Sequence, residues 1–325
     1  MDRSIARPPA PTPYGIPCDV IHVGLPKCGS SFLQQSGFAW HPEIALIWEP
    51  GPRLFFELRD RAGSPGFDLA EYAGRLRPFV ARLRSRQAEA KRVVFSFEGF
   101  CGPQATNRND AALAEVLREL LGPVRVVLIV REPYRLLFSL WGQYIREGGR
   151  LGLRDYLNDP RSPARPADPA ENIYGRVCYD RYLQVLWDRF GRENTGLFFF
   201  EDFVGDYRSF MRQLYEFTGV DPSLMPANTT LWRGPNHFHA TWFRMLNRFS
   251  TSSHHAGWLS QRVYRRYRGL ADRFVFSSKR LNPTTRIQTR TRVPPPMQAA
   301  IARSNRRLAE LSGRDLAGLG YSMER

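Results

Sequence analysis

The alternation of short apolar runs with amphipathic stretches predicts an α/β protein. Runs that are apolar almost throughout, as is typical of strands buried on both faces, occur at Val20–Gly24, Ile44–Trp48, Arg92–Phe97, Val124–Val130 and Thr195–Phe200. Helical spacing of apolar residues predicts helices at Phe32–Trp40, Leu69–Lys91, Asp110–Leu121, Pro133 to about Arg146, Val177–Phe190 and Tyr207–Thr218. This order predicts a three-layer α/β/α fold with a central, mostly parallel sheet.

The same pattern predicts one domain with two insertions. Residues 1–15 are rich in proline and read as a flexible leader, and residues 16–325 form the single predicted domain. Within it, about 147–173 and 222–295 are predicted insertions on the lid or acceptor side. The first of these contains Gly148–Pro169, rich in Gly, Pro and Arg, which we expect to be irregular.

Charged or small residues follow several of the predicted strands. Glu49, Glu98 and Arg131 each come directly after or near the end of an apolar run, and the loop Leu25–Ser31 follows the first run. Ligands of parallel sheets bind outside the carboxyl ends of the strands. We therefore expect these segments to converge on one site.

Composition excludes several classes of protein. With 325 residues, 42% of them hydrophobic, the chain is long enough to bury a large core. No run of 18 apolar residues occurs and the first residues lack the apolar block of a signal peptide, so we expect a cytoplasmic protein. The four cysteines are scattered without a CxxC pair, which predicts free thiols rather than disulfides or a structural zinc site.

The charge balance favours an anionic partner. Lysine and arginine number 47 against 31 acidic residues, for a net charge of +16. Only Lys27, Lys91 and Lys279 are lysine, and genome composition equally explains an arginine bias, so the lysine positions are more informative than the total. There is no nucleic-acid-binding motif, and we expect no nucleic-acid partner. The aromatic and basic stretch from His237 to Arg268 is compatible with an acceptor pocket, a peripheral membrane contact or helix packing.

The loop after the first strand has the chemistry of a phosphate-binding loop. Small residues between a buried strand and a helix let backbone N–H groups surround an anion. In the nucleotide triphosphatase pattern GxxxxGK[ST] the lysine directly follows the last glycine, whereas here Lys27 precedes Gly29 by two residues. Where many such enzymes have a magnesium-binding Asp, the run Val124–Val130 leads to Arg131. Both departures favour charge neutralisation by Lys and Arg.

At these residues the chain resembles the sulfotransferases that use 3'-phosphoadenosine 5'-phosphosulfate (PAPS). The run Lys27-Cys28-Gly29-Ser30-Ser31-Phe32 is similar to their 5'-phosphosulfate loop, and Arg131–Ser139 (REPYRLLFS) is similar to their 3'-phosphate motif. The resemblance continues through Tyr179–Val220 and Asn305–Tyr321. It implies a P-loop-like fold and a metal-independent, in-line transfer of a sulfuryl group from PAPS to an acceptor hydroxyl.

The resemblance also implies roles for single residues. Lys27 would stabilise the phosphate oxygen that departs from sulfur, Arg131 and Ser139 would bind the 3'-phosphate, and one of Arg286, Arg290 and Arg292, of which we select Arg290, would close over the nucleotide. The residues expected to bind PAPS are Pro26, Lys27, Cys28, Gly29, Ser30, Ser31, Phe32, Arg131, Ser139 and Arg290. Phe32 either stacks on adenine or belongs to the core.

The acceptor requires a general base, for which the sequence offers two glutamates. Glu98 directly follows a buried run and is slightly favoured over Glu49, and either carboxylate is also explained as a helix cap or a salt-bridge partner. The histidines are weaker candidates: His22 lies within a predicted strand as an expected core imidazole, and His237 with His239 lacks further metal ligands. We expect no metal.

The predicted function is therefore PAPS-dependent sulfation of a small-molecule or glycan acceptor, with carbohydrate favoured because a glutamate base is typical of the glycan-modifying relatives. The first alternative is a phosphate-loop kinase that uses ATP and magnesium. The second is a nucleic-acid binder driven by net charge. Oligomeric state is not predicted.

Overall fold

The computed structural model describes residues 13–48, 53–102, 110–159, 162, 172–225 and 289–323. Glu49 and the stretches around Trp232–Arg280 and Arg286 lie outside these ranges. By internal contacts the chain divides into two compact units, residues 1–130 with 179–230 and residues 131–178 with 231–325. The single domain that the sequence predicts stays a prediction.

The first unit contains a five-stranded, all-parallel sheet. Its strands are β1 (Val20–His22), β2 (Ile44–Ile47), β3 (Arg92–Ser96), β4 (Arg125–Val130) and β5 (Thr195–Phe199), in the spatial order β2-β3-β1-β4-β5. Strand β1 is buried along its whole length between β3 and β4. The predicted strands are confirmed, each within two residues of its expected ends.

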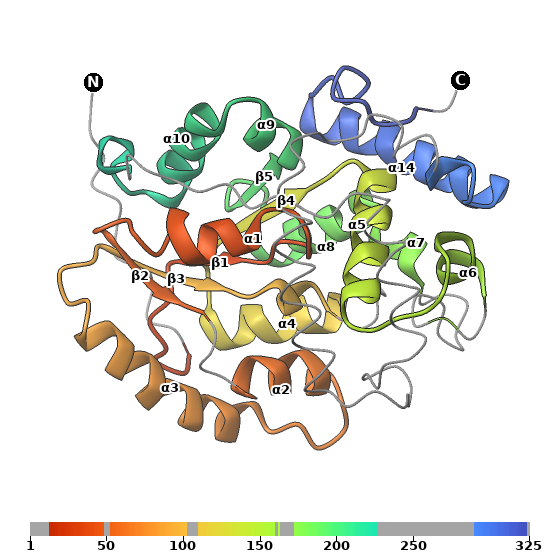
Figure 1. Cartoon of the computed structure of the whole chain (residues 1–325). Coiled ribbons are helices and arrows are strands. Elements are labelled where there is room, and N and C mark those ends of the chain that lie inside the picture. The colour runs from red at the N-terminus through yellow and green to blue at the C-terminus, as the bar shows by residue number, and fades with distance from the viewer. Residues whose placement is uncertain are drawn as a thin grey trace, which may run out of the picture. The chain divides into compact units, whose positions relative to one another are not determined.

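Helices cover both faces of this sheet. The helical segments of the first unit are α1 (Ser30–Phe32), η1 (Leu33–Gly37), α2 (Arg53–Arg61), α3 (Leu69–Ser85), η2 (Glu98–Cys101), α4 (Asp110–Leu121), α8 (Tyr179–Phe190), α9 (Phe200–Gly205), α10 (Tyr207–Thr218) and η3 (Pro222–Leu224). Figure 1 shows α1, α9 and α10 on one side of the sheet and α2, α3 and α4 on the other. The predicted three-layer α/β/α architecture is confirmed.

Two helices of this unit differ from the prediction. Helix α3 ends at Ser85 instead of Lys91, and the chain turns there because Arg86 and Gln87 donate backbone hydrogen bonds only three residues back. The segment after α1 is a π-helix, η1, rather than a continuous α-helix. A π-turn inserts one extra residue per turn and is frequent at functional sites.

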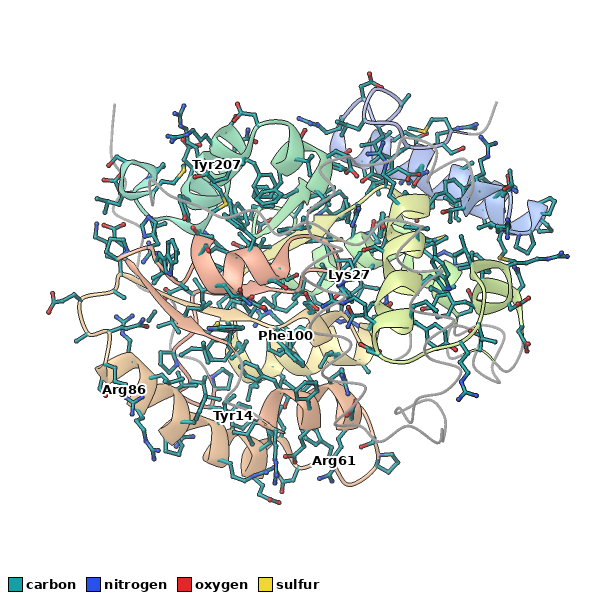
Figure 2. All side chains as sticks on the ribbon, viewed as in Figure 1. Tyr14, Lys27, Arg61, Arg86, Phe100 and Tyr207 are labelled. Atoms are coloured by element: carbon teal, nitrogen blue, oxygen red, sulfur yellow. The ribbon has the colours of Figure 1, made fainter. Side chains whose placement is uncertain are left out.

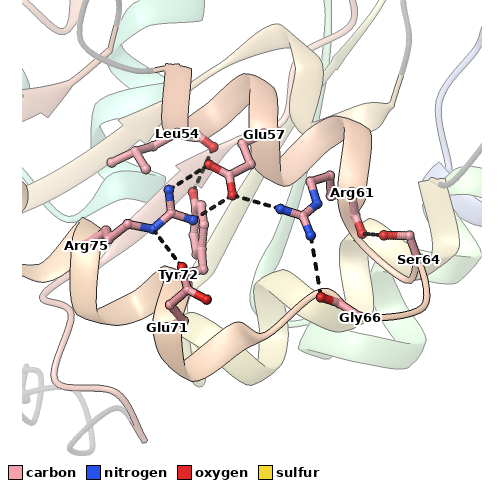
Figure 3. A network of polar contacts seen from close by, with 8 residues as sticks. All are labelled: Leu54, Glu57, Arg61, Ser64, Gly66, Glu71, Tyr72 and Arg75. Carbon is pink, nitrogen blue, oxygen red and sulfur yellow. Dashed lines mark hydrogen bonds and ion pairs between the residues drawn. The ribbon is translucent and has the colours of Figure 1, made fainter.

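Helix α2 was not predicted, and it is fixed on α3 by a polar network (Figure 3). The Glu57 carboxylate accepts hydrogen bonds from Arg75 at 2.6 and 2.9 Å and from Arg61 at 3.5 Å. The Tyr72 hydroxyl donates to the carbonyl of Leu54 at 3.1 Å. These contacts hold α2 beside the short segment η2, which it also packs against.

In its described residues the second unit is helical. It contains α5 (Pro133–Arg146), α6 (Leu153–Asn158), α7 (Ile173–Arg176) and α14 (Pro295–Ser312). Helix α5 begins as predicted, with Pro133 in the first turn, and the buried Glu132 caps it by accepting from the N–H groups of Tyr134 and Arg135 at 3.3 and 2.8 Å. Within the described ranges, none of the helices has the length and apolar character needed to cross a membrane.

Helix α6 corrects the expectation that Gly148–Pro169 is irregular. Its residues Leu153, Tyr156 and Leu157 have helical spacing and are buried. The ring of Tyr156 packs on Tyr144 of α5, with the centroids 4.9 Å apart. Apolar burial therefore forms a short helix in a stretch whose composition indicated a loop.

A buried polar cluster joins the amino ends of β2 and β3 to the end of α10. Glu43 is only 8% exposed, forms an ion pair with Lys91 and accepts from the Asp221 N–H at 2.8 Å. The Glu43 N–H donates to Nδ1 of His41 at 3.2 Å, so Nε2 of His41 carries the proton that goes to the Asp221 carbonyl at 3.0 Å. Lys91 therefore has a structural partner at the end of the sheet opposite Glu98.

The Glu43 cluster predicts loss of stability in acid. Burial raises the pKa of Glu43, but Lys91 and the Asp221 N–H outweigh it, so this pKa is lowered on folding. Burial also lowers the pKa of His41. Both groups bind protons more readily in the unfolded chain. Their contribution to the free energy of unfolding therefore declines as the pH falls below about 6.5 for His41 and about 4.3 for Glu43.

We expect Glu43→Gln to lower the free energy of unfolding at neutral pH by about 1–3 kcal/mol and to flatten its decline in acid, because an ionised hydrogen-bond partner is lost. Thermal unfolding followed by circular dichroism across pH measures both effects. Glu115→Gln, which removes an exposed pair with Arg189, is the control. Equal pH profiles for wild type and Glu43→Gln would contradict the assignment.

Candidate functional site

The loop after β1 leaves the sheet between two paired neighbours. The N–H of Val23 donates to the carbonyl of Val127 at 3.0 Å, and the N–H of Phe97 donates to the carbonyl of His22 at 3.3 Å. Pairing of β1 with β3 and with β4 therefore continues to the carboxyl end of β1. The loop Leu25–Ser31 starts from a position that is defined on both sides.

The connections after β1 and β3 diverge at this edge. From β1 the chain continues through α1 to β2, whereas from β3 it continues through η2 and α4 to β4, on the other face of the sheet (Figure 1). Neighbouring strands whose connections leave on opposite faces form a topological switch point, which is where open α/β sheets bind ligands. The structure thus places the lysine-bearing loop and Glu98 after adjacent strands, and the convergence of all four predicted segments on one site stays a prediction.

Lys27 has an unusual backbone conformation. Among the described residues it is the one non-glycine residue with positive φ, at 66°. Figure 2 shows it in the loop between β1 and α1. The left-handed region costs an L-residue about 1–2 kcal/mol, and such strain clusters at functional sites. Gly29, at φ 92°, adopts the left-handed conformation without this cost.

The start of α1 presents hydrogen-bond donors. The first backbone hydrogen bond of this helix is donated by the N–H of Phe32 to the carbonyl of Gly29 at 3.0 Å. The N–H groups of Ser30 and Ser31 lie before this bond, at the amino end of the helix. Ser30 is 1% exposed, and its hydroxyl has no hydrogen-bond partner within the described part of the chain. A buried hydroxyl without a partner is costly, and an anion in the loop would satisfy it.

The other loop residues support this geometry. Pro26 and Cys28 are buried, and the Cys28 thiol lies 3.8 Å from the carbonyl oxygen of Pro26. Phe32 is 4% exposed and packs on Phe203 and Tyr207, with ring centroids 5.0 and 6.0 Å away. Of the two roles that the sequence left open for Phe32, the structure shows the packing of a core residue. Stacking on adenine stays a prediction.

Glu98 begins η2 in an aromatic environment. Its neighbours Phe97 and Phe100 lie 5.2 Å apart between ring centroids, and both pack on Phe55 of α2. The Glu98 carbonyl accepts from the thiol of Cys101 at 3.0 Å. Glu98 is half-buried and begins η2, directly after the strand β3 that pairs with the loop-bearing strand β1. Glu49, the second predicted base, lies outside the described residues, as do His237 and His239.

The predicted 3'-phosphate residues belong to the second unit. Arg131 is bonded directly to Val130, the last residue of β4, and Ser139 lies two turns into α5; both are half-buried. Arg290 is exposed, donates to the side chain of Gln298 at 3.2 Å and has an electrostatic effect on Tyr134 in the first turn of α5. Arg290 therefore lies near the start of the helix that Arg131 precedes.

Sequence reasoning missed a buried polar group beneath the loop. His22, which was expected to be a satisfied core imidazole, is 0% exposed and lies 2.8 Å from the Ser96 hydroxyl through Nδ1. The Gln34 side chain in η1 donates to the same hydroxyl at 3.1 Å. The signal was present: His22 and Ser96 are the one polar residue in each of the runs VIHVG and VVFSF, and parallel register pairs them.

All four cysteines are buried thiols that form no disulfide, as predicted. Burial raises the pKa of Cys18 well above its ordinary value, so this thiol is not ionised at neutral pH.

The strain at Lys27 gives a testable difference between two variants. We expect Lys27→Gly to be more stable than Lys27→Ala by about 1 kcal/mol, because glycine adopts positive φ without a Cβ penalty. Chemical denaturation of both variants measures this difference. Equal stabilities, or a more stable alanine variant, would show that residue 27 does not hold the left-handed conformation.

Comparison with known proteins gives structural likeness only. No protein-family model and no curated protein sequence matches the chain. Among solved structures, a sulfotransferase from Alicyclobacillus acidocaldarius aligns over 93% of this chain and 98% of its own, with a TM-score of 0.58 and 18% identity.

Two further sulfotransferases align with lower scores. The sulfotransferase domain of the Synechococcus PCC 7002 olefin synthase covers 92% of this chain and 96% of its own at TM-score 0.44 and 16% identity. A mouse sulfotransferase complexed with PAP aligns over 93% of this chain and 88% of its own, with a TM-score of 0.43 and 13% identity. Because the alignment to the Alicyclobacillus enzyme spans nearly the whole of both chains, the protein has the fold of that sulfotransferase.

Proposed function

We propose that the protein is a sulfotransferase that moves the sulfuryl group of PAPS to an acceptor hydroxyl. The observation that carries this proposal is the loop between β1 and α1, where Lys27 is held at positive φ and the Ser30 hydroxyl is buried without a partner among the described residues. The fold shared with a solved sulfotransferase supports it.

The loop residues fit the 5'-phosphosulfate end of this donor. N–H groups of Ser30 and Ser31 with the Ser30 hydroxyl would bind the phosphate oxygens. The donor supplies an activated sulfuryl group, whose bond to the phosphate oxygen breaks as the acceptor oxygen bonds to sulfur. The Lys27 ammonium would neutralise the charge that grows on the departing phosphate oxygen.

The second motif fits the 3'-phosphate end. The guanidinium of Arg131 can bind a phosphate through two parallel N–H groups, and the hydroxyl of Ser139 can donate a further hydrogen bond. Arg290, near the first turn of α5, would add a third positive or donor group. Because β4 neighbours β1, the two motifs follow adjacent strands of one sheet.

A carboxylate completes the chemistry. Glu98 would accept the proton that the acceptor hydroxyl releases, and Glu49 is the other candidate. The positive charges in the two motifs are lysine and arginine, so we propose transfer without a metal. We also propose a carbohydrate or another small hydroxyl compound as acceptor, on the basis of the carboxylate base.

Transfer of radiolabelled sulfate from PAPS to a panel of acceptors tests the function. We expect transfer by the wild type in the presence of EDTA, loss of at least about 100-fold in Lys27→Ala, and a mainly weaker affinity for PAPS in Arg131→Ala. Arg303→Ala, on the surface of α14, is a matched control for the loss of an arginine. Wild-type rates in Lys27→Ala would refute the role of the loop.

Ligand binding separates this proposal from a phosphate-loop kinase. We expect 3'-phosphoadenosine 5'-phosphate (PAP) to raise the unfolding temperature more than ATP with magnesium does, because the site offers cations rather than a metal-binding Asp. Differential scanning fluorimetry with both ligands measures this. Protection by ATP with magnesium and none by PAP would favour the kinase.

Two isosteric variants identify the base. We expect Glu98→Gln to lower kcat by about 100-fold or more, since general-base catalysis typically contributes about 10²–10⁴-fold, and Glu49→Gln to retain most activity. The pH profile of kcat should lose its acidic limb only in the variant that lacks the base. Full activity in both variants would mean that the proton goes elsewhere.

A further inference from the structure

A hydrogen-bond relay, buried at His22 and Ser96 and half-buried at Gln34, connects the loop after β1 with the end of β3. His22 ends β1, Ser96 ends β3, and the two are partners in the parallel register. The Ser96 hydroxyl lies 2.8 Å from Nδ1 of His22 and 3.1 Å from Nε2 of Gln34, and Gln34 belongs to the π-helix η1 that follows the loop. One hydroxyl therefore links three separate segments.

The partners fix the direction of the protons. Gln34 Nε2 also approaches the Ser96 carbonyl oxygen at 3.4 Å, and since a carbonyl only accepts, the Gln34 amide nitrogen must be the donor in both contacts. The Ser96 hydroxyl accepts from Gln34, and Nδ1 of His22 is its only other hydrogen-bond partner among the described residues, so its own proton is satisfied only when it is donated to Nδ1. The neutral imidazole then carries its proton on Nε2.

The protonated nitrogen lies against the start of the loop. A Cβ built on Gly24 would be 2.1 Å from Nε2 of His22, so only glycine fits at this position. Nε2 is buried and has no hydrogen-bond partner within the described ranges. The remaining face of the imidazole packs edge-on to Phe38 at 6.1 Å, and burial lowers the pKa of His22 to about 3, so the ring stays neutral.

We propose that His22, Ser96 and Gln34 are positioning residues that set the lysine-bearing loop against the carboxyl end of β3. This inference rests on the proposed function. Gln34 restrains the helix behind the loop, His22 lies beneath Gly24 at the start of the loop, and Ser96 precedes Glu98 by two residues. The relay therefore joins the donor-binding segment to the segment of the general base.

Chemistry distinguishes such a role from simple packing. His22 and Ser96 are polar side chains buried in the sheet, which is more costly than apolar residues of the same shape, and their hydrogen bonds with the half-buried Gln34 favour one arrangement of the segments that they join. Sulfuryl transfer in line requires the acceptor, base and leaving oxygen to be aligned, and a misplacement of about 1 Å costs about 100-fold in rate. The relay supplies that alignment without contacting the reactants.

Kinetics of Ser96→Ala provide the first test. We expect kcat to fall by about 10- to 100-fold while the dissociation constant of PAP, measured by calorimetry, stays unchanged, because the loop itself remains intact. Ser96→Thr retains the hydroxyl in a strand-compatible residue and should restore kcat. Thr195→Val removes a comparable buried hydroxyl contact, to the Gly191 carbonyl at 2.9 Å, and should leave kcat unchanged.

If Ser96→Ala and Thr195→Val lower kcat equally, or if Ser96→Thr restores none of it, the relay is merely structural and the proposal is wrong.

Nitrogen-15 NMR of histidine provides a test that needs no turnover. The His22 signals, identified by their absence in His22→Gln, should show a protonated Nε2 and an unprotonated Nδ1, should lose this single tautomer in Ser96→Ala, and should shift when PAP is added. If the wild type transfers no sulfate, the proposed function fails and the tautomer of His22 still decides the relay. A proton on Nδ1, or a tautomer that Ser96→Ala leaves unchanged, would overturn the relay. His22 signals that stay unmoved while calorimetry shows that PAP binds would overturn its link to the donor site.

Discussion

The pairing of β1 with a strand on each side is the constraint on which the site depends. Strand β1 is only three residues long, yet β3 and β4 bond to it and to residues just beyond it, at Phe97 and Val23. A loop that starts from a strand held on both sides has little freedom at its origin. Backbone strain at Lys27 is tolerated because the neighbouring segments determine the path of the chain.

The two ends of the sheet differ in how their buried polar groups are satisfied. At the amino ends, Glu43 gathers Lys91, His41 and Asp221 into contacts that satisfy one another. At the carboxyl ends, the hydroxyl of Ser30 and Nε2 of His22 are buried without a hydrogen-bond partner in the described part of the protein. These two buried groups lie in or next to the loop where a ligand is expected.

Much of this arrangement could be predicted from the sequence, because buried parallel strands and amphipathic helices have distinct apolar patterns. Helices α4, α5 and α10 begin and end where their patterns do. Helix α2 was missed because its placement depends on Arg75 and Tyr72 in α3, and α6 because composition concealed three buried residues. Tertiary contacts determined both.

The site was predictable to a similar degree. The sequence pointed to the loop and Glu98 because strand ends in a parallel sheet share one edge, and their roles stay predictions. The left-handed Lys27 and the hydrogen bond between Ser96 and Gln34 were not, since backbone strain and the meeting of residues 62 positions apart arise only from the folded register. The role of Phe32 was left open by its pattern, and the folded chain places its ring against α9 and α10.

The net charge of +16 contributes less to the functional argument than these local features do. Many arginines of the first unit are already engaged: Arg75 and Arg61 with Glu57, Arg59 with Asp60, and Arg189 with Glu115. Exposed pairs of this kind contribute little to stability, and the 16 basic residues in excess of the acidic ones produce a positive field that does not distinguish one anion from another. An excess of arginine spread over a surface favours many anionic partners weakly. The proposed site rests instead on a lysine in a strained loop, a buried serine hydroxyl in the same loop and a glutamate that follows the neighbouring strand. Geometry rather than total charge therefore supports an enzyme over a binder of polyanions.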